Sequence, residues 1–392
     1  MIHHTLSRRE FLEAAAAVGG GTLLGCNQPT ARPPAQIVTG LDAGPNGEAW
    51  ERVLAAARAE GVVNVYGGSG SNNRDAEVEP FERAFPGIKM NGLFGPGRDL
   101  VNRVVAERTA NKKIPDVMVG PGASGIFILK PIGALPPLEP ALILPEVTDT
   151  SKWLNNRLWF VDADPPNTTI GFVGSVQGTT YYNPDLVDPK EFTSYLDLLN
   201  PKWKGKIVAT DVRLAGGGAA PSRFWYTHPD LGPSYLERLF GEMDVTIGRD
   251  QRQMIDWVAQ GRYPIGILFS STDVRQAIDD GLPIAAVDPH QFREGAPMST
   301  GGGAISLVEG GPNPNAAKVF VNWLLSRDGQ LNWQKYIKAP SLRNDINRDD
   351  VPPDSIPKLG LNYLDVSNEH YAALSADEIS PLLDRIFERT GR

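Results

Sequence analysis

Residues 62–72 read VVNVYGGSGSN, a short apolar run followed at once by a glycine-rich segment. β-branched and aromatic residues predict a strand over residues 62–66, and the glycines predict the loop that ends it. A helix is expected over residues 76–85, ended by Pro86 and Gly87, and a second strand over residues 88–93. This order of strand, helix and strand is typical of an α/β fold.

The same alternation extends on both sides of this stretch. An amphipathic helix is expected over residues 48–60 and another over residues 99–110. Residues 116–119 (DVMV) predict a strand that ends in a second glycine loop, residues 120–125 (GPGASG). Doubly wound sheets bind ligands beyond the carboxyl ends of such strands, so both loops are candidate binding segments.

The N-terminus carries export signals. Residues 7–12 (SRREFL) form a twin-arginine pattern, an apolar stretch follows, and residues 23–26 (LLGC) resemble the lipobox of bacterial lipoproteins. Cys26 is the only cysteine, which excludes an intramolecular disulfide, and we expect it to carry lipid. Residues 1–26 are therefore predicted to be a Tat signal peptide. The proline-containing residues 27–47 are predicted to be a flexible tether on the extracytoplasmic face of a membrane.

Composition limits the partners. The formal net charge of -8 argues against nucleic acid. The 41 glycines and 33 prolines suit the many loops of an α/β chain, since apolar residues also run throughout. The part after the signal and tether is long enough for two domains of ordinary size.

Three groups of motifs carry a family resemblance. They are VY at 65–66 with FPGIK at 85–89, YYNPDLV at 181–187 with YLDLLNPKWKGKI at 195–207, and NPNAAK at 313–318 with WLLSRDGQ at 323–330. In this order they resemble the periplasmic solute-binding proteins of ATP-driven importers, in the branch that includes the ferric-iron binders.

The resemblance implies a type II-like, two-lobed α/β periplasmic binding protein. Each lobe would be a mixed sheet flanked by helices, with the ligand cleft between the lobes. We expect residues 48–170 plus 292–330 in the first lobe and residues 171–291 plus 331–392 in the second, with crossovers near 170–177 and 284–292. The implied role is the substrate-binding component of an ABC importer. The protein would capture a small solute by hinge closure, pass it to the membrane permease, and need no cofactor or catalysis.

The ferric binders of the branch hold iron through a histidine in the first glycine loop, a glutamate in the loop after the second main strand, and an adjacent tyrosine pair. Here the first loop has no histidine, the second has no carboxylate, and residues 269–272 (FSST) follow the strand where the tyrosine pair belongs. Tyr181 and Tyr182 fall in the middle strand motif instead. Because Fe³⁺ requires hard anionic donors, iron is the alternative and not the first expectation.

The first expectation is a small oxyanion, such as an organic carboxylate, a phosphonate or a phosphate ester. Glycine loops let the backbone approach a ligand, helix N-termini favour anions, and Arg213 could offer a bidentate fork. A neutral sugar-like or polyol ligand stays open. The candidate ligand-binding residues are Gly68, Ser69, Gly70, Ser71, Asn72, Gly122, Ala123, Ser124, Arg213, Gly217, Gly218, Ser270, Ser271, Thr272, Ser299 and Thr300.

A Tat-exported dinucleotide-dependent oxidoreductase is the alternative from another class. Residues 120–125 match G-x-G-x-x-G directly after a strand, but Pro121 removes one backbone donor. No second strand ends in an acidic residue about 20 positions later, where a ribose contact is expected. His228, His290 and His370 read as loop residues, and neither G-x-S-x-G nor H-E-x-x-H occurs.

Overall fold

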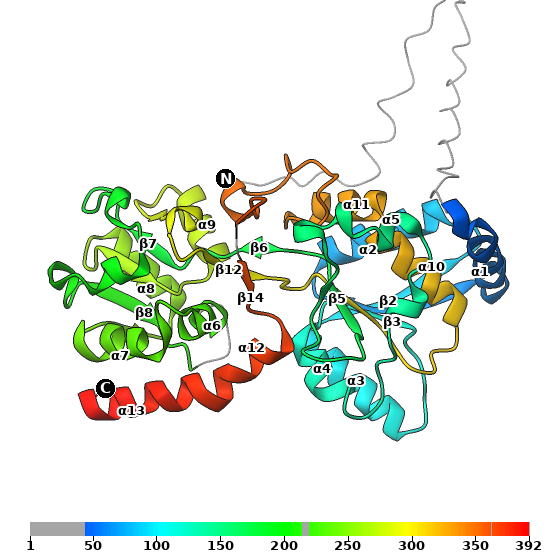
Figure 1. Cartoon of the computed structure of the whole chain (residues 1–392), viewed down its shortest axis with the longest axis horizontal. Helices are drawn as coiled ribbons and strands as arrows, with labels where there is room; N and C mark the ends of the chain where they lie inside the picture. Colours follow the sequence, from blue (N-terminus) through cyan, green and yellow to red (C-terminus); the bar gives the residue numbers. More distant parts are fainter. Residues whose placement is uncertain (1–43, 214–218, 362, 392) are drawn as a thin grey trace, which may run out of the picture. The chain divides into compact units, whose positions relative to one another are not determined.

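The computed structural model describes residues 44–213, 219–361 and 363–391 (Figure 1). The predicted signal peptide, Cys26, Gly217 and Gly218 lie outside the described residues. The end of the predicted tether belongs to the folded part of the chain. The side-chain amide of Asn46 donates a hydrogen bond to the Ile143 carbonyl at 2.8 Å, and helix α1 begins at Gly47.

The first lobe is built on a six-stranded mixed sheet with the order β2-β1-β3-β13-β5-β4. Strand β1 is parallel to β2 and β3, and its register with β2 runs from Val62 opposite Lys89 to Gly68 opposite Gly95. Strand β13 is antiparallel to β3 and β5. The strands are β1 (Val62–Gly68), β2 (Lys89–Gly95), β3 (Val117–Val119), β4 (Trp159–Phe160), β5 (Thr169–Gly171) and β13 (Ala304–Leu307).

The helices of this lobe agree closely with the sequence pattern, except at one end. Helix α2 begins at Ser71, five residues before the expected start at 76, because Gly70 makes the turn out of β1 with a φ of 101°. Ser71 and Asn72 are therefore helical. The helices are α1 (Gly47–Glu60), α2 (Ser71–Ala84), α3 (Gly97–Thr109), α4 (Ala123–Leu129), α5 (Pro145–Thr148), α10 (Pro314–Leu325) and α11 (Arg327–Ile337).

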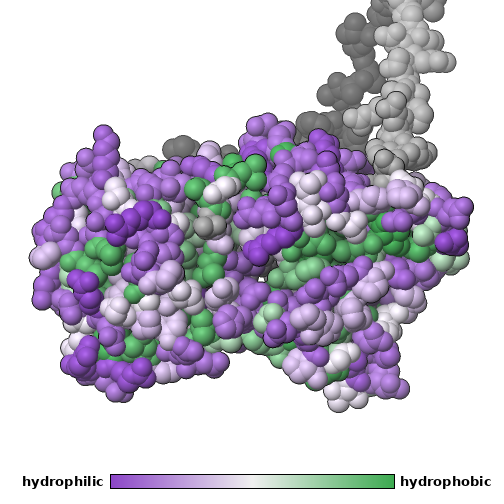
Figure 2. Space-filling model, viewed as in Figure 1, coloured by the Kyte–Doolittle hydropathy of each residue, from purple (hydrophilic) through white to green (hydrophobic). Residues whose placement is uncertain are grey.

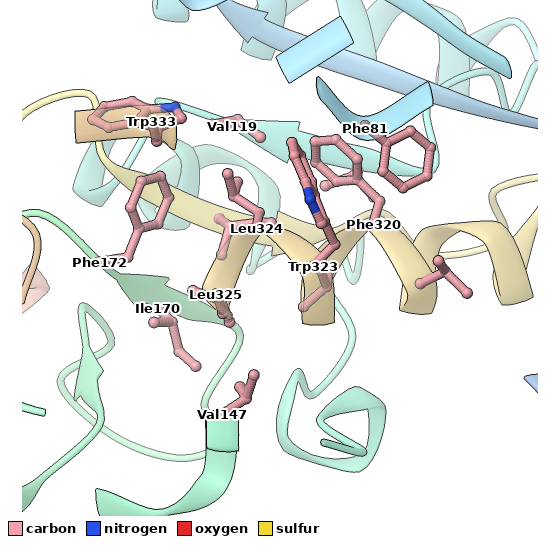
Figure 3. Close-up of a cluster of buried hydrophobic side chains, with 14 of the residues drawn as sticks. Phe81, Val119, Val147, Ile170, Phe172, Phe320, Trp323, Leu324, Leu325 and Trp333 are labelled. Atoms are coloured by element: carbon pink, nitrogen blue, oxygen red, sulfur yellow. The ribbon is translucent and has the colours of Figure 1, made fainter. Parts of the chain in front are cut away.

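Aromatic residues fill the core of the first lobe (Figure 3). The Phe81 ring on α2 packs edge-on against Phe320 and Trp323 of α10, with ring centroids 5.2 and 5.4 Å apart. Trp333 of α11 meets Phe172 at 5.0 Å in the same way. Such contacts add to the stabilisation that comes from burying large apolar side chains. Trp323 and Trp333 are both buried.

The second lobe has a five-stranded sheet with the order β11-β7-β10-β8-β9. Strand β10 is parallel to β8 and antiparallel to β7. The strands are β7 (Thr180–Tyr182), β8 (Ile207–Thr210), β9 (Thr246–Gly248), β10 (Ile265–Ile267) and β11 (Ala285–Ala286). The helices are α6 (Ala219–Thr227), α7 (Gly232–Glu242), α8 (Gln251–Ala259), α9 (Ser271–Asp279) and α13 (Ser380–Thr390).

A three-stranded sheet carries the chain between the lobes. Its order is β14 (Tyr363–Asp365), β12 (Ala296–Ser299) and β6 (Ser175–Val176). The first crossover runs from β5 to β6. The second was placed at 284–292, but it runs from β12 to β13 at 296–304, because β11 at 285–286 pairs with β7 inside the second lobe. A third crossing through β14 was not anticipated.

The C-terminal part divides between the lobes. Helix α11 packs on α2, and Trp333 and Leu342 join the first core, so residues 331–342 belong with the first lobe and not with the second as we expected. Helix α12 (Glu369–Leu374) leads to α13, which places Leu383 and Phe387 in the second core.

In the described part of the chain, none of the helices combines the length and the apolar character needed to cross a bilayer. The face in Figure 2 is mostly hydrophilic, with smaller apolar areas between the polar residues.

Candidate functional site

Three of the predicted loops meet at the carboxyl ends of β1 and β3. A Cβ placed on Gly120 would lie 3.6 Å from the backbone nitrogen of Gly68 and 3.8 Å from the carbonyl oxygen of Gly302. Gly120 has a φ of 120°, which side chains rarely adopt, so this approach depends on glycine. The loops after β1 and β3 therefore lie at one edge of the sheet.

Thr300 lies behind this edge. It is fully buried, and its Oγ1 has no hydrogen-bond partner among the described residues. A Cβ on Gly122 would lie 3.8 Å from that oxygen. Neighbouring Ser299 is bonded internally, because its hydroxyl lies 2.9 Å from that of Ser367 and accepts from the backbone N–H of Gly301. Both side chains therefore support the turn between β12 and β13.

The remaining first-lobe candidates lie at helix starts. Ser69 and Gly70 form the short turn after β1, where the Ser69 carbonyl accepts a hydrogen bond from the Asn73 side chain at 2.7 Å. Ser71 and Asn72 are exposed in the first turn of α2, and Ala123 and Ser124 open α4.

The second-lobe candidates open helix α9. Ser270 is its N-cap, and the hydroxyl accepts a hydrogen bond from the backbone N–H of Asp273. Ser271 lies next to the buried phenol of Tyr181, with the two hydroxyl oxygens 3.1 Å apart. The Tyr181 ring stacks on Phe269 with centroids 5.7 Å apart. Tyr181 was set aside as a strand residue, so its approach to Ser271 is a contact that the sequence did not reveal.

These helix-start residues line a cavity of about 640 Å³ beside the first crossover. The crossover contributes Ser175 and Gln177, the second lobe contributes the start and one side of α9, and residues 337–339 with 352–355 close the far wall. The side-chain oxygen of Gln177 is buried and has no hydrogen-bond partner among the described residues. An unpaired acceptor beside several hydroxyls is suited to a ligand with many oxygen atoms.

The two basic side chains that line this cavity are paired with acids. Arg275 donates to both carboxylate oxygens of Asp354 at 2.7 Å, and the Lys338 ammonium lies 3.3 Å from Asp350. The lining therefore offers mainly neutral hydrogen-bonding groups. Burial raises the pKa of Tyr181 to about 12, so its phenol stays protonated at neutral pH and is a poor metal ligand.

Arg213 is engaged elsewhere. Its Nε and Nη2 donate to the two carboxylate oxygens of Asp211 at 2.8 and 2.9 Å, and Nη1 donates to Asp384 of α13 at 2.9 Å. Its guanidinium also lies 4.7 Å from the centre of the Phe387 ring. We expected the Arg213 guanidinium to bind an anionic ligand, but its bidentate edge binds the Asp211 carboxylate. Through Asp384, Arg213 instead attaches the C-terminal helix α13 to the rest of the second lobe.

The described residues hold no group of three or more His, Cys, Asp or Glu side chains that could bind a metal ion. His228 and His290 make local contacts, one with the backbone N–H of Asp230 and the other with the Tyr363 hydroxyl. Residues 123–125 of the glycine motif form the first turn of α4, directly after β3, and Pro121 leaves that turn without one backbone N–H donor.

The comparison with known families identifies the class of protein to which the chain belongs. The profile of the bacterial extracellular solute-binding proteins matches residues 67–331, which is more than half of the chain. The chain is a bacterial extracellular solute-binding protein. This solute-binding protein is the substrate-binding component of an ABC importer and acts on the extracytoplasmic side of the membrane.

Two curated proteins are similar over most of their length. The "Iron uptake protein A1" of Synechocystis is 24% identical over 353 residues, covering 83% of this chain and 84% of that protein. The "Probable ABC transporter periplasmic-binding protein y4fP" of Sinorhizobium fredii is 26% identical over 279 residues, covering 68% and 70%. These relatives are solute-binding proteins and not enzymes, which favours transport over the oxidoreductase alternative.

A solved structure confirms the fold. The Trichodesmium protein IdiA (FutA), described in complex with iron and citrate ligands, superposes with a TM-score of 0.61 at 23% identity, covering 83% of this chain and 99% of that one. The two-lobed periplasmic binding protein fold with mixed sheets is therefore established for this solute-binding protein. At this identity the likeness concerns the fold alone.

Proposed function

We propose that this solute-binding protein serves iron uptake and carries ferric iron as an anionic chelate with an organic acid. The names of the relatives favour iron over the free oxyanion that was our first expectation. One similar curated protein is an iron uptake protein, and the similar Trichodesmium structure holds iron together with citrate. The organic carboxylate of our first expectation then enters as the carrier of the metal.

The observation that carries this proposal is that this chain resembles an iron uptake protein but has few metal-binding side chains among its described residues. Fe³⁺ requires several hard anionic donors. The described residues offer no His, Cys, Asp or Glu group of three, Phe269, Ser270 and Ser271 follow β10, and the Tyr181 phenol is held neutral. If the protein handles iron, the donors have to come from the cargo.

The cavity beside α9 supports the binding of such a chelate. The nine-residue helix presents free backbone N–H groups and a positive dipole end at its start, which favours carboxylate oxygens. The hydroxyls of Ser271 and Thr272 add donors, and the unpaired oxygen of Gln177 can accept from a hydroxyl of the organic acid. We expect the loops after β1 and β3 to cover the chelate from the first lobe as the lobes close.

A thermal-unfolding panel on the mature chain without its lipidated cysteine, residues 27–392, tests the proposal. The probes are ferric citrate, citrate alone, ferric nitrilotriacetate and fructose 6-phosphate. We expect ferric citrate to raise the free energy of unfolding by about 2.7 kcal/mol at a hundredfold excess over its Kd, and the other probes to have much smaller effects. A large shift with fructose 6-phosphate alone would instead support a phosphate ester as cargo.

We also propose that lipid on Cys26 holds the protein at the membrane, next to the ABC permease that receives the cargo. The order of the twin-arginine pattern, the apolar stretch and the LLGC motif supports this placement. Each buried CH₂ of an acyl chain contributes about 0.8 kcal/mol of membrane affinity, so a multiply acylated terminus stays anchored.

A further inference from the structure

A second cavity, of about 570 Å³, lies apart from the cavity beside α9. One wall is β4, the edge strand of the first sheet, and the other is the segment that runs from β14 into α12. Its size is within the usual range for small-molecule sites. The lining residues that carry the argument are Arg157, Trp159, Asp162, Asp365, His370 and Tyr371.

The cavity has one cation without an acidic partner. The Arg157 guanidinium lies 3.8 Å from the centre of the Trp159 ring, and the side chain is exposed. Within the described ranges, no carboxylate lies close enough to form an ion pair with it. Stacking on the indole fixes the plane of the guanidinium and leaves its edge available for a bidentate contact with a carboxylate.

The opposite wall has an anion without a cationic partner. Asp365, at the end of β14, is only 7% exposed, and its carboxylate accepts one hydrogen bond, from the backbone N–H of Ser367 at 2.9 Å. Burial raises the pKa of Asp365 to about 6, so the group is mostly ionised at neutral pH. No lysine or arginine of the described chain forms an ion pair with it, although Arg157 and Arg223 act on it from a distance.

Asp162, the other acidic residue that lines this cavity, differs from Asp365 in having many hydrogen-bond partners. Asp162 accepts hydrogen bonds from both backbone and hydroxyl of Thr168, from the backbone of Thr169 and from the ammonium of Lys130. Asp162 is therefore saturated and structural. The Arg157 and Asp365 charges, by contrast, face one cavity from opposite walls and are too far apart to pair directly.

We propose that this cavity binds a small zwitterion of the α-amino acid class, with its carboxylate on Arg157 and its ammonium group on Asp365. A simple anion would leave Asp365 unpaired and repelled, and a simple cation would do the same to Arg157. A metal ion is disfavoured because the donors do not form a group of three among the described residues.

The test is a thermal-shift screen of the mature chain against the twenty L-amino acids, followed by calorimetry with the one that gives the largest shift. We expect its N-acetyl and amide derivatives, which each remove one charge, to bind at least tenfold more weakly. Asp365→Asn and Arg157→Gln should have the same effect, whereas Arg58→Gln on the exposed face of α1 should have none. Arg157 and Arg58 are both exposed, so these two variants are matched for folding.

Ferric citrate binding serves as the check on the variants, because it uses the other cavity. Weakened amino acid binding together with unchanged ferric citrate binding supports the assignment. The assignment is overturned if no amino acid binds, if the N-acetyl derivative binds as tightly as the free amino acid, or if both variants bind it like the parent. These three overturning results do not depend on whether iron is the cargo.

Discussion

The hydroxyl oxygens of Tyr181 and Ser271 lie 3.1 Å apart, although 90 residues separate them in the chain. Tyr181 also donates a hydrogen bond to the Gly178 carbonyl at 3.0 Å. The phenol therefore packs against the start of α9, and its proton is donated in a hydrogen bond. This relationship separates a structural tyrosine from a metal-binding one, because a phenolate would have to leave these contacts to reach a metal ion.

Substitutions of this pair should have different effects. Ser271→Ala removes a hydroxyl that faces the cavity, and we expect it to weaken ferric citrate binding by about tenfold. Tyr181→Phe should lower the free energy of unfolding by about 1 kcal/mol and leave the affinity within about threefold. Calorimetric titration measures the first effect and denaturant unfolding the second, with exposed Ser151→Ala as the control. A larger affinity loss in Tyr181→Phe would give the phenol a direct role.

Arg213→Ala should affect stability and not binding. Asp211 is buried and would lose a bidentate partner, and α13 would lose its bond through Asp384, so we expect a loss of about 1–3 kcal/mol. Arg213 lowers the pKa of Asp211, so this stabilisation is present at neutral pH and is lost as pH falls through the lowered pKa. Arg249→Ala, on the same carboxylate but mostly exposed, should cost less than about 0.5 kcal/mol. An Arg213→Ala chain of unchanged stability but weakened binding would restore the anion-clamp role.

Glu77 should make stability fall as pH rises. It is fully buried on α2, and neither its oxygens nor the nearby Trp333 indole nitrogen has a hydrogen-bond partner among the described residues. Burial raises its pKa from 4.5 to about 8, an effect that the proximity of Trp333 offsets only in part. In the unfolded chain Glu77 ionises at its ordinary pKa of 4.5. Below that pH it does not lower the free energy of unfolding. Between that pH and the folded pKa of about 8, the free energy of unfolding falls by about 1.4 kcal/mol per pH unit.

Glu77→Gln should remove this dependence. Denaturant unfolding between pH 4 and 9 should show a falling curve for the parent and a flatter one for the variant. Glu79→Gln, two residues away on the exposed side of α2, keeps the parent curve because Glu79 is solvated. Parallel curves for Glu77→Gln and the parent would mean that Glu77 is ionised in the folded chain.

Cys26→Ser should release the protein from membranes. The change removes the thiol that we expect to be acylated, so no lipid can attach at this position. Fractionation of cells and labelling with a radioactive fatty acid measure the effect, with Thr30→Ala in the predicted tether as the control. Continued labelling and sedimentation with membranes would contradict the lipobox interpretation.

The sequence predicted the lobes better than the site. Alternating apolar and helical patterns located β1, β2 and α1 to within a few residues, because strand and helix periods are local properties. The second crossover was misplaced because Ala285 and Ala286 pair with β7, a long-range contact that no local pattern records. The third crossing, at β14, is only three residues long and has no distinctive composition.

Predicting the candidate site required knowledge of contacts between residues that are distant in the sequence. The glycine loops were located correctly because glycine reports local backbone geometry. The engagement of Arg213 by Asp384 joins positions 171 residues apart, and the pairing of Tyr181 with Ser271 is similarly remote. The sequence therefore could not show whether a charged loop residue such as Arg213 is already paired within the folded chain.

The most direct test of the central claim is a titration of the mature chain with ferric citrate, followed at once by calorimetry and by visible absorption. The account predicts saturable binding of the chelate without a new phenolate-to-iron charge-transfer band, because citrate supplies the donors and Tyr181 stays protonated. It would be contradicted by a strong phenolate band, which would show that tyrosines of the chain ligate the iron, or by the absence of any binding heat with ferric citrate.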